Sequence, residues 1–199
     1  MPAASRGPLI RDEDSGGAID PTTFQDTDGT RYLIWKNNGN AVGQNTWLWL
    51  QKLSAAGMGV AGKPSKLIKQ DQAWEGNLVE APTLCRHGSK SYLFYSANNY
   101  SSRSYAVGYA VADTVAGPDT VAGPYTKPLS APWLGSTNGV CGPGGEEVVT
   151  ASDGLQWMAY HAWAKGPGSY RAMSIDKMSW VGDRPVLAGP SQTVQTAPF

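Results

Sequence analysis

The 199-residue sequence has few cysteines, few charged residues and no long apolar run. Its two cysteines, Cys85 and Cys141, have no second Cys or His at metal-ligand spacing, which excludes a disulfide framework and a zinc site built on them. We expect both to be small buried residues, with a single disulfide between them as the alternative. No stretch approaches the ~18 apolar residues of a membrane span, and residues 1–30 lack the apolar core of a signal peptide.

Charge is also scarce and balanced. Charged residues make up 16% of the chain, with 16 Lys and Arg against 16 Asp and Glu. A chain without net charge has no electrostatic reason to seek nucleic acid or an anionic membrane, so neither is expected as a partner. Glycine (24), proline (14) and aromatic residues (10%, including eight Trp) are plentiful instead. This mixture favours short strands joined by tight turns in a single all-β domain.

An internal repeat is the most informative feature of the sequence. DTDGTRYLIWK (26–36), RHGSKSYLFYS (86–96) and ASDGLQWMAYHAW (151–163) each place a glycine turn before an alternation of aromatic and aliphatic residues. Period-two alternation of this kind predicts strands covered on both faces. Gly29 and Gly88 are 59 residues apart, and Gly88 and Gly154 are 66 apart, but the second interval contains DTVAGP twice (113–118 and 119–124). The underlying unit is therefore about 60 residues long.

Four strands can be counted in each unit, including a short one at 125–127 in the second. Four-stranded units repeating along a chain are typical of a β-propeller, in which each blade packs against its neighbours. We predict three blades, at approximately 16–75, 76–140 and 141–199; a β-sandwich with repeated hairpins is the alternative. Propellers close with four or more blades, so three would leave two blade faces open. The sequence is then either a piece of a longer protein or a chain that self-associates through those faces.

The first strand of each propeller blade lines the central channel, and two carboxyl residues occur there. Aligning GGAIDPTTF with NLVEAPTLC gives Asp20 and Glu80 equivalent places, each near a proline. Two carboxyl groups facing one channel fit glycosidic bond cleavage, in which one protonates the leaving oxygen while another activates water. A turn-opening Asp and a solvated Glu at a strand end are the simpler explanation of the same pattern.

The quoted segments, in their order along nearly the whole chain, resemble the later part of glycoside hydrolase family 43. Members of that family are five-bladed propellers and inverting enzymes that act on arabinofuranosides and xylosides of plant cell walls. The resemblance implies that Glu80, in VEAP, is the general acid. It implies that Asp20, in AIDP, orients that acid and modulates its pKa. The family's general base is an Asp on the first blade, and this sequence has no matching segment.

Two further sets of acids could supply the missing base. Asp12 and Asp14 lie in a polar segment before the first strand, where a solvated loop is expected. Glu146 precedes Gly154 by eight residues, as Glu80 precedes Gly88, but the matching family segment is a glycine-rich turn followed by a polar residue. Neither Glu146 nor its neighbour Glu147 is therefore expected to be catalytic.

The resemblance also points to residues that bind substrate or metal. His161, in AYHAW, matches a family His that faces the channel near a bound calcium ion, so a structural calcium there is an expectation; a satisfied core histidine is the alternative. Arg171 resembles a family Arg near the sugar, and Trp74 or Trp35 could stack on a sugar ring, although each suits packing as well.

The sequence therefore supports two functions of different classes. The first is a glycoside hydrolase acting on arabinan- or xylan-type saccharides, extracellular as most of the family is, with Glu80 and Asp20 in the site. The second is a catalytically inactive carbohydrate-binding propeller fragment. A third reading, a truncated product that barely folds, predicts non-cooperative melting and exposed apolar faces.

Overall fold

The computed structural model describes residues 7–113 and 120–196. Its strands form three antiparallel sheets, ordered β1-β2-β3-β4, β5-β6-β7 and β8-β9-β10-β11. The strands are β1 (Ala18–Gln25), β2 (Arg31–Asn37), β3 (Trp47–Leu53), β4 (Val60–Lys69), β5 (Val79–His87), β6 (Lys90–Ala97), β7 (Ala106–Asp113), β8 (Cys141–Thr150), β9 (Gln156–Trp163), β10 (Arg171–Val181) and β11 (Arg184–Leu187). Short 3₁₀ helices precede or connect the strands: η1 (Glu13–Ser15), η2 (Gly39–Val42), η3 (Ala73–Glu75) and η5 (Thr120–Ala122).

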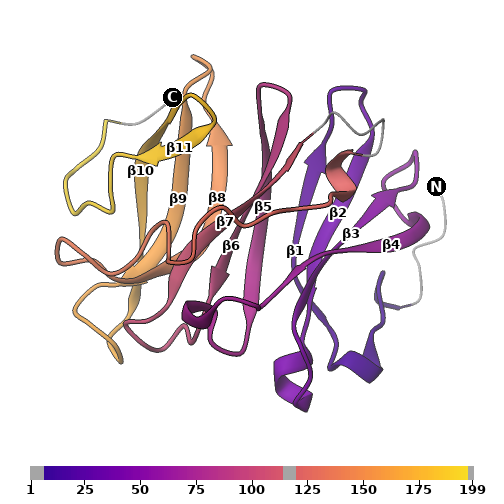
Figure 1. Cartoon of the computed structure of the whole chain (residues 1–199), viewed down its shortest axis with the longest axis horizontal. Coiled ribbons are helices and arrows are strands. Elements are labelled where there is room, and N and C mark those ends of the chain that lie inside the picture. The colour runs from indigo at the N-terminus through magenta and orange to yellow at the C-terminus, as the bar shows by residue number, and fades with distance from the viewer. Residues whose placement is uncertain (1–6, 114–119, 197–199) are drawn as a thin grey trace.

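The three sheets stand side by side as propeller blades, with β1, β5 and β8 as neighbouring inner strands (Figure 1). Each sheet runs outward from its inner strand in chain order, which is the arrangement that a repeated four-strand unit predicts. The all-β, partial-propeller prediction is confirmed. The inner strands of consecutive blades contact each other, so side chains on neighbouring inner strands lie close together.

Two apolar cores hold the blades together, one on each side of the middle sheet. Alternate residues of β6 serve the two cores: Leu93, Tyr95 and Ala97 pack toward the first sheet, and Tyr92 and Phe94 pack toward the third. All five are at most 1% exposed. Burying a side chain of the larger kinds contributes about 1.5–3 kcal/mol. The period-two pattern of SYLFYSA is thus explained by a strand covered on both faces.

Among the described residues, the middle sheet has the three strands β5, β6 and β7 and no fourth, which differs from the prediction. The segment 125–127 pairs with β7 at one residue only, where Thr126 and Val111 exchange two backbone hydrogen bonds of 2.8 and 2.9 Å. Pro124 and Pro128 flank this segment and have no N–H to donate, so the ladder cannot extend in either direction. Most of the tandem DTVAGP repeat lies outside the described residues.

A β-bulge interrupts the pairing in each inner strand. The register shifts lie between Ile19 and Thr22, between Glu80 and Thr83, and between Gly144 and Glu147. In each strand the first residue inside the bulge has a left-handed backbone conformation. These residues are Asp20, Ala81 and Gly145, with φ of 53°, 48° and 63°. Asp20 therefore corresponds to Ala81, and Glu80 corresponds to Ile19. The predicted equivalence of Asp20 and Glu80 is wrong by one residue.

Unequal hairpin turns explain this error. The turn between β1 and β2 spans residues 26–30 and that between β8 and β9 spans 151–155, but β5 and β6 are joined by Gly88 and Ser89 alone. Counting back from the turn glycine therefore reaches different places in the three blades. The glycines themselves behave as expected, since Gly29, Gly88 and Gly154 all have positive φ.

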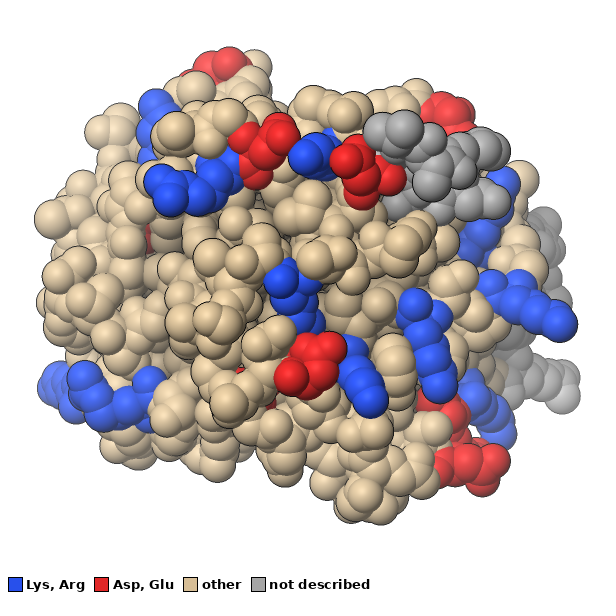
Figure 2. All heavy atoms as spheres, viewed as in Figure 1, with Lys and Arg blue, Asp and Glu red and all other residues tan. Residues whose placement is uncertain are grey.

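The remaining surface carries little charge. Basic and acidic side chains both occur across the face shown in Figure 2, and uncharged residues make up most of it. Among the described residues, no helix is long and apolar enough to cross a membrane. Cys85 and Cys141 are buried and are not bonded to each other, as the first of the two alternatives predicts. Met173, in β10 of the third sheet, is 84% exposed.

Candidate active site at the inner strand bulges

Asp20 and Glu80 come from neighbouring blades and meet at their bulges. Asp20 Oδ2 accepts a hydrogen bond of 3.0 Å from the backbone N–H of Ala81, the residue that follows Glu80. The left-handed conformation of Asp20 turns its side chain toward this strand. One carboxylate thus holds the backbone beside the other, even though the two positions are not equivalent in the repeat.

Two donors hold the carboxylate of Glu80. The Tyr105 hydroxyl donates to Oε1 at 2.7 Å, and the Lys36 ammonium donates to Oε2 at 3.3 Å. The Lys36 side chain is only 2% exposed and that of Glu80 is 17% exposed, so this is a largely dehydrated ion pair. Burial, followed by the charge of Glu80, raises the pKa of Tyr105, which therefore stays a donor.

The network continues to Arg171 and His161. The Arg171 guanidinium lies 5.2 Å from the ring centroids of both Tyr105 and Trp163. Its Nε donates to His161 Nδ1, and its terminal nitrogens donate to the carbonyls of Tyr100, Gly142 and His161 at 2.7–3.0 Å. Burial and the adjacent guanidinium lower the pKa of His161, so the ring is a neutral acceptor at Nδ1.

Glycines in β8 make room for this network. A Cβ on Gly144 would come within 2.1 Å of the Tyr105 ring, and one on Gly145 within 2.2 Å of His161 Nε2. Gly145 also has the positive φ of the bulge. The GPGG sequence is thus required here for the close approach of two side chains and for the backbone geometry.

Lys36 and Tyr105 were missed in the sequence, although a signal for the first existed. Lys36, Ser96 and His161 occupy the same place in the three aligned hairpins, opposite the first residue of each bulge. Polar residues at that place end runs that are otherwise apolar, which indicates a common inward-facing position. Tyr105 lies just before β7 and shares no such pattern, so only the tertiary structure places it at Glu80.

Glu146 is buried behind this network. It is 4% exposed, its Oε2 accepts a hydrogen bond of 2.5 Å from the Ser96 hydroxyl, and Oε1 has no partner among the described residues. Burial raises the pKa of Glu146 to about 8. Glu147 instead accepts a hydrogen bond of 2.9 Å from Thr83 and a long one of 3.5 Å from Thr22, which ties the three inner strands together.

The buried Glu146 predicts a pH-dependent stability. Below about pH 4.5 both states carry the proton; between there and about pH 8 the unfolded chain releases it while the folded chain keeps it. Stability therefore falls as the pH rises, by about 1.4 kcal/mol for each pH unit of that window. Glu146→Gln has no carboxyl group at this position and does not lose stability in this way. The difference in free energy of unfolding, variant minus wild type, should therefore increase steadily from pH 5 to pH 8 in urea titrations.

Glu13→Gln is the matched control for this prediction. The Glu13 side chain is 85% exposed, so its substitution removes the same formal charge without changing a buried group. A difference between Glu146→Gln and wild type that stays constant from pH 5 to pH 8 would show that Glu146 carries no protonation difference between the two states.

The other candidates lie apart from the network of Asp20, Glu80 and Arg171. Trp35 is 4% exposed and stacks on Trp49, with centroids 6.3 Å apart. Trp74 packs against the first core and stacks on Tyr95 at 6.0 Å. These rings therefore pack within the protein, and the structure offers no support for sugar stacking by them. Asp12 and Asp14 belong to the turn around η1, and Asp14 is exposed.

The described residues do not fit a calcium ion held by this chain's side chains. No group of three His, Cys, Asp or Glu lies together in the part of the chain that the structure describes. His161 supplies one nitrogen donor, whereas calcium prefers six to eight oxygens, and the cationic Arg171 lies against its ring.

The chain is similar in sequence and in fold to known glycoside hydrolases. A family model described as Glycosyl hydrolases family 43 matches residues 5–185. The chain is 30% identical over 153 residues to an extracellular exo-α-(1→5)-L-arabinofuranosidase of Streptomyces avermitilis. It superimposes on a thermostable family-43 glycoside hydrolase with 29% identity and a TM-score of 0.78, and on an endo-1,4-β-xylanase of Bacteroides thetaiotaomicron with 25% identity and a TM-score of 0.74.

The matched regions differ in how much of each protein they cover. They take in 74% of this chain but 31% of the arabinofuranosidase. For the two structures they take in 92% and 94% of this chain, and 61% and 62% of the related chains. The chain thus spans less than two thirds of the length of these relatives.

Proposed function

Because the chain belongs to glycosyl hydrolases family 43, we propose that it hydrolyses O-glycosidic bonds in arabinan- or xylan-type saccharides, with Glu80 as the general acid. The observation that carries the proposal is the hydrogen bond from Ala81 to Asp20, which joins the two carboxyl residues at one pair of bulges. The names of two relatives, an arabinofuranosidase and a xylanase, support this substrate class. The name of the first also supports an extracellular location.

The proposed reaction begins at the Glu80 carboxyl group. Its proton passes to the glycosidic oxygen as the bond from that oxygen to the anomeric carbon breaks. Water adds to the anomeric carbon and loses a proton to a base. In the structure each oxygen of Glu80 accepts one hydrogen bond, and a carboxyl oxygen has two acceptor positions, so a position remains for the proton that is transferred. The Lys36 contact, at 3.3 Å, is the longer of the two.

Asp20 and Arg171 have positioning roles in this proposal. Asp20 fixes the backbone next to Glu80, and Arg171 packs against the Tyr105 ring that supports the Glu80 carboxylate. Neither role requires a covalent step. The resemblance implies a separate Asp as the base and inversion at the anomeric carbon, and the sequence contains no match for that Asp.

Product analysis tests the proposal directly. The natural protein, purified from its source, and the 199-residue chain are incubated with arabinohexaose and xylohexaose, and ¹H NMR follows the anomeric signals. We expect new reducing ends of inverted configuration from one of the two substrates. Release of a product with retained configuration would rule out the inverting mechanism, and absence of any product from both proteins would rule out hydrolysis.

A second function, carbohydrate binding without cleavage, is favoured by one observation. The third carboxyl group that the resemblance implies has no match in this sequence, while the network around Arg171 is intact. Saturable binding of either hexaose by the 199-residue chain, with no product after long incubation, would establish binding without hydrolysis.

A further inference from the structure

Glu146 is a buried carboxyl group that has no part in the reaction proposed above. It lies in β8, directly after the left-handed Gly145 of the bulge. Its Oε2 accepts the hydrogen bond of 2.5 Å from the Ser96 hydroxyl, and its Oε1 has no partner among the described residues. Burying a polar atom without a partner costs about 1–3 kcal/mol, so such a group in a native structure needs an explanation.

The Ser96 hydroxyl joins Glu146 to the bulge of β8. Ser96 donates to Glu146 Oε2 and accepts a hydrogen bond of 2.8 Å from the backbone N–H of Gly145. In the middle sheet, Ser96 of β6 pairs with Glu80 of β5. One hydroxyl thus ties the bulge of the third blade to the position directly opposite the candidate acid.

The Tyr105 ring packs on the same bulge. A Cβ on Gly144 would collide with this ring and would approach Ser96 Oγ to 2.8 Å, so the ring and the hydroxyl flank one backbone position. The Tyr105 hydroxyl donates to Glu80 Oε1 at 2.7 Å. The place of Tyr105 therefore depends on the β8 backbone, and Glu146 helps to fix that backbone through Ser96.

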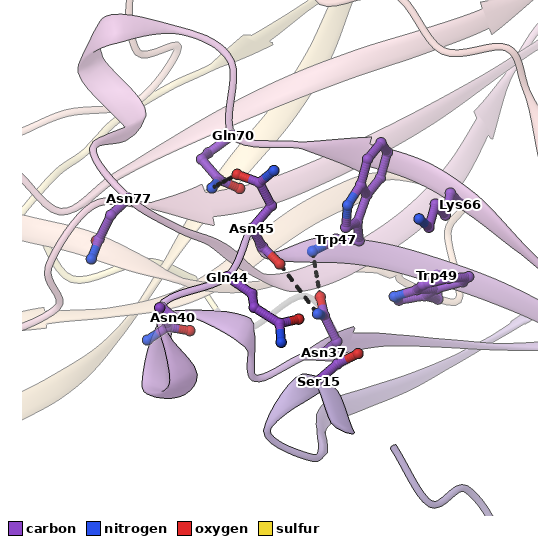
Figure 3. A pocket seen from close by; sticks show the side chains of 11 residues that line it. Ser15, Asn37, Asn40, Gln44, Asn45, Trp47, Trp49, Lys66, Gln70 and Asn77 are labelled. Carbon is purple, nitrogen blue, oxygen red and sulfur yellow. Dashed lines mark hydrogen bonds between the residues drawn. The ribbon is translucent and has the colours of Figure 1, made fainter. Parts of the chain in front are cut away.

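The surroundings of Glu146 are supplied by two blades of this chain. They differ in this respect from a pocket on the first sheet, where Trp47, Trp49 and Lys66 lie on the face opposite the middle sheet (Figure 3). No second sheet covers that face among the described residues. Glu146 is 4% exposed and lies between the middle and third sheets, so its contacts do not depend on a further blade.

Glu146 acts in this place as a neutral group. Burial raises its pKa to about 8, and the nearby carboxylates of Glu80 and Glu147 act in the same direction. Near neutral pH the side chain therefore keeps its proton and adds no negative charge beside Glu80. An amide oxygen could accept the Ser96 hydrogen bond equally well, whereas an apolar side chain could not.

We propose that Glu146 is a positioning residue for the general acid: it fixes the β8 bulge through Ser96, and the bulge holds Tyr105 against Glu80. The role rests on the proposed hydrolysis, and it involves no covalent step and no contact between Glu146 and the saccharide. Because Tyr105 bonds to the acid itself, its displacement should impair proton donation more than substrate binding.

Glu146→Met tests this role in the kinetics of the natural protein. Met is unbranched and similar in length to Glu, but it cannot accept the Ser96 hydrogen bond in the same way. It should lower kcat on xylohexaose or arabinohexaose at least about tenfold and change KM less than about threefold. The loss on a 4-nitrophenyl glycoside, whose leaving group needs little protonation, should be smaller. Glu146→Gln should restore most of the kcat that Glu146→Met loses.

The signals of Tyr105 provide a second measurement that needs no hydrolysis. In ¹³C NMR spectra of the 199-residue chain with labelled tyrosine, the Tyr105 ring signals should shift in Glu146→Met and in Ser96→Ala. They should stay near their wild-type positions in Glu146→Gln. Combining Glu146→Met with Ser96→Ala should shift them little further, because both substitutions remove the same hydrogen bond.

Asp176→Leu is the matched control for the loss of a buried carboxyl group. Asp176, in β10 of the same blade, is 1% exposed and accepts a hydrogen bond of 2.6 Å from the Tyr160 hydroxyl. Its replacement should lower stability but leave the Tyr105 ring signals unmoved. Circular dichroism checks that each variant is folded, and Ser96→Ala replaces Glu146→Met if the latter does not fold.

The proposal is overturned if the folded Glu146→Met and Ser96→Ala variants leave the Tyr105 signals unmoved. Equal losses of kcat for Glu146→Met and Glu146→Gln would also overturn it, since the carboxyl group itself would then be required. An equal loss on the hexaose and the nitrophenyl substrate would indicate a purely structural role and would overturn it as well. If the wild-type protein hydrolyses neither hexaose, the proposed function fails, whereas the Tyr105 signals still report whether Glu146 positions this tyrosine.

Discussion

Glu80→Gln is expected to lower turnover of arabino- or xylo-oligosaccharides by about 10²–10⁴-fold, the range typical of a lost general acid. Gln keeps the shape of the side chain and its carbonyl oxygen still accepts from Lys36 or Tyr105, so the fold should persist. It cannot release a proton to the leaving oxygen. The measurement is kcat for wild type and variant in the natural protein, with circular dichroism to confirm folding.

The choice of leaving group makes this prediction specific to proton donation. A 4-nitrophenyl glycoside releases a stable phenolate that needs little protonation, whereas a sugar leaving group needs the full proton. Glu80→Gln should therefore slow the oligosaccharide far more than the nitrophenyl substrate. An equal loss on both would indicate a role in binding or in structure. Glu13→Gln, at an exposed side chain, controls for the removal of one carboxylate.

Lys127→Met is expected to destabilise the protein by about 3–5 kcal/mol, the usual loss when one partner of a buried ion pair is removed. The Lys127 side chain is 6% exposed and that of Glu75 is fully buried. The ammonium donates to both Glu75 oxygens at 2.7 and 2.9 Å, and to the Lys69 carbonyl at 2.6 Å. Without it, the Glu75 carboxylate stays buried without a countercharge.

This ion pair joins the first two blades. Lys127 belongs to the segment that replaces the fourth strand of the middle sheet, whereas Glu75 is in η3, which follows the first sheet. Glu75 also accepts from the Tyr95 hydroxyl at 2.7 Å and from the backbone N–H groups of Asp71 and Gln72. The charged contact thus links the segment after β7 to η3, beside the first blade.

Thermal and urea unfolding measure the predicted loss, which corresponds to a decrease in Tm of roughly 6–20 °C for a domain of this size. The double variant Lys127→Met with Glu75→Gln should recover part of the stability, since it leaves no unpaired buried charge. Lys165→Met, at an exposed position, should change stability by less than about 0.5 kcal/mol. A loss of stability below 1 kcal/mol for Lys127→Met would contradict the interpretation that Lys127 neutralises the buried Glu75 carboxylate.

Several features of this protein could be predicted from its sequence because they depend on local chemistry. The glycine turns and the period-two runs of RYLIWK, SYLFYSA and QWMAYHAW predict hairpins, and their spacing predicts blades. Glu80 and Asp20 were identified because repeated units place their inner strands side by side. A regular repeat indicates which distant segments of the chain lie next to each other, whereas the pattern of a single strand does not.

The same reasoning failed where the units deviate from one another. The two-residue turn at Gly88 and Ser89 shifted the alignment by one residue, and paired the wrong positions of β1 and β5. The prolines around 125–127 removed a strand that the repeat predicts. Both are local departures from the repeat, and register in a sheet changes with each inserted or deleted residue.

What the sequence determined by itself was the class of fold, the number of blades in the chain and the two carboxyl residues at the inner strands. Only the tertiary structure decided which groups surround them. Tyr105 reaches Glu80 from outside the repeat pattern, Lys127 reaches Glu75 across 52 residues, and Trp35 and Trp74 are enclosed by packing. Strand patterns follow from nearest neighbours in the chain, whereas such contacts depend on how the blades pack, which no local pattern encodes.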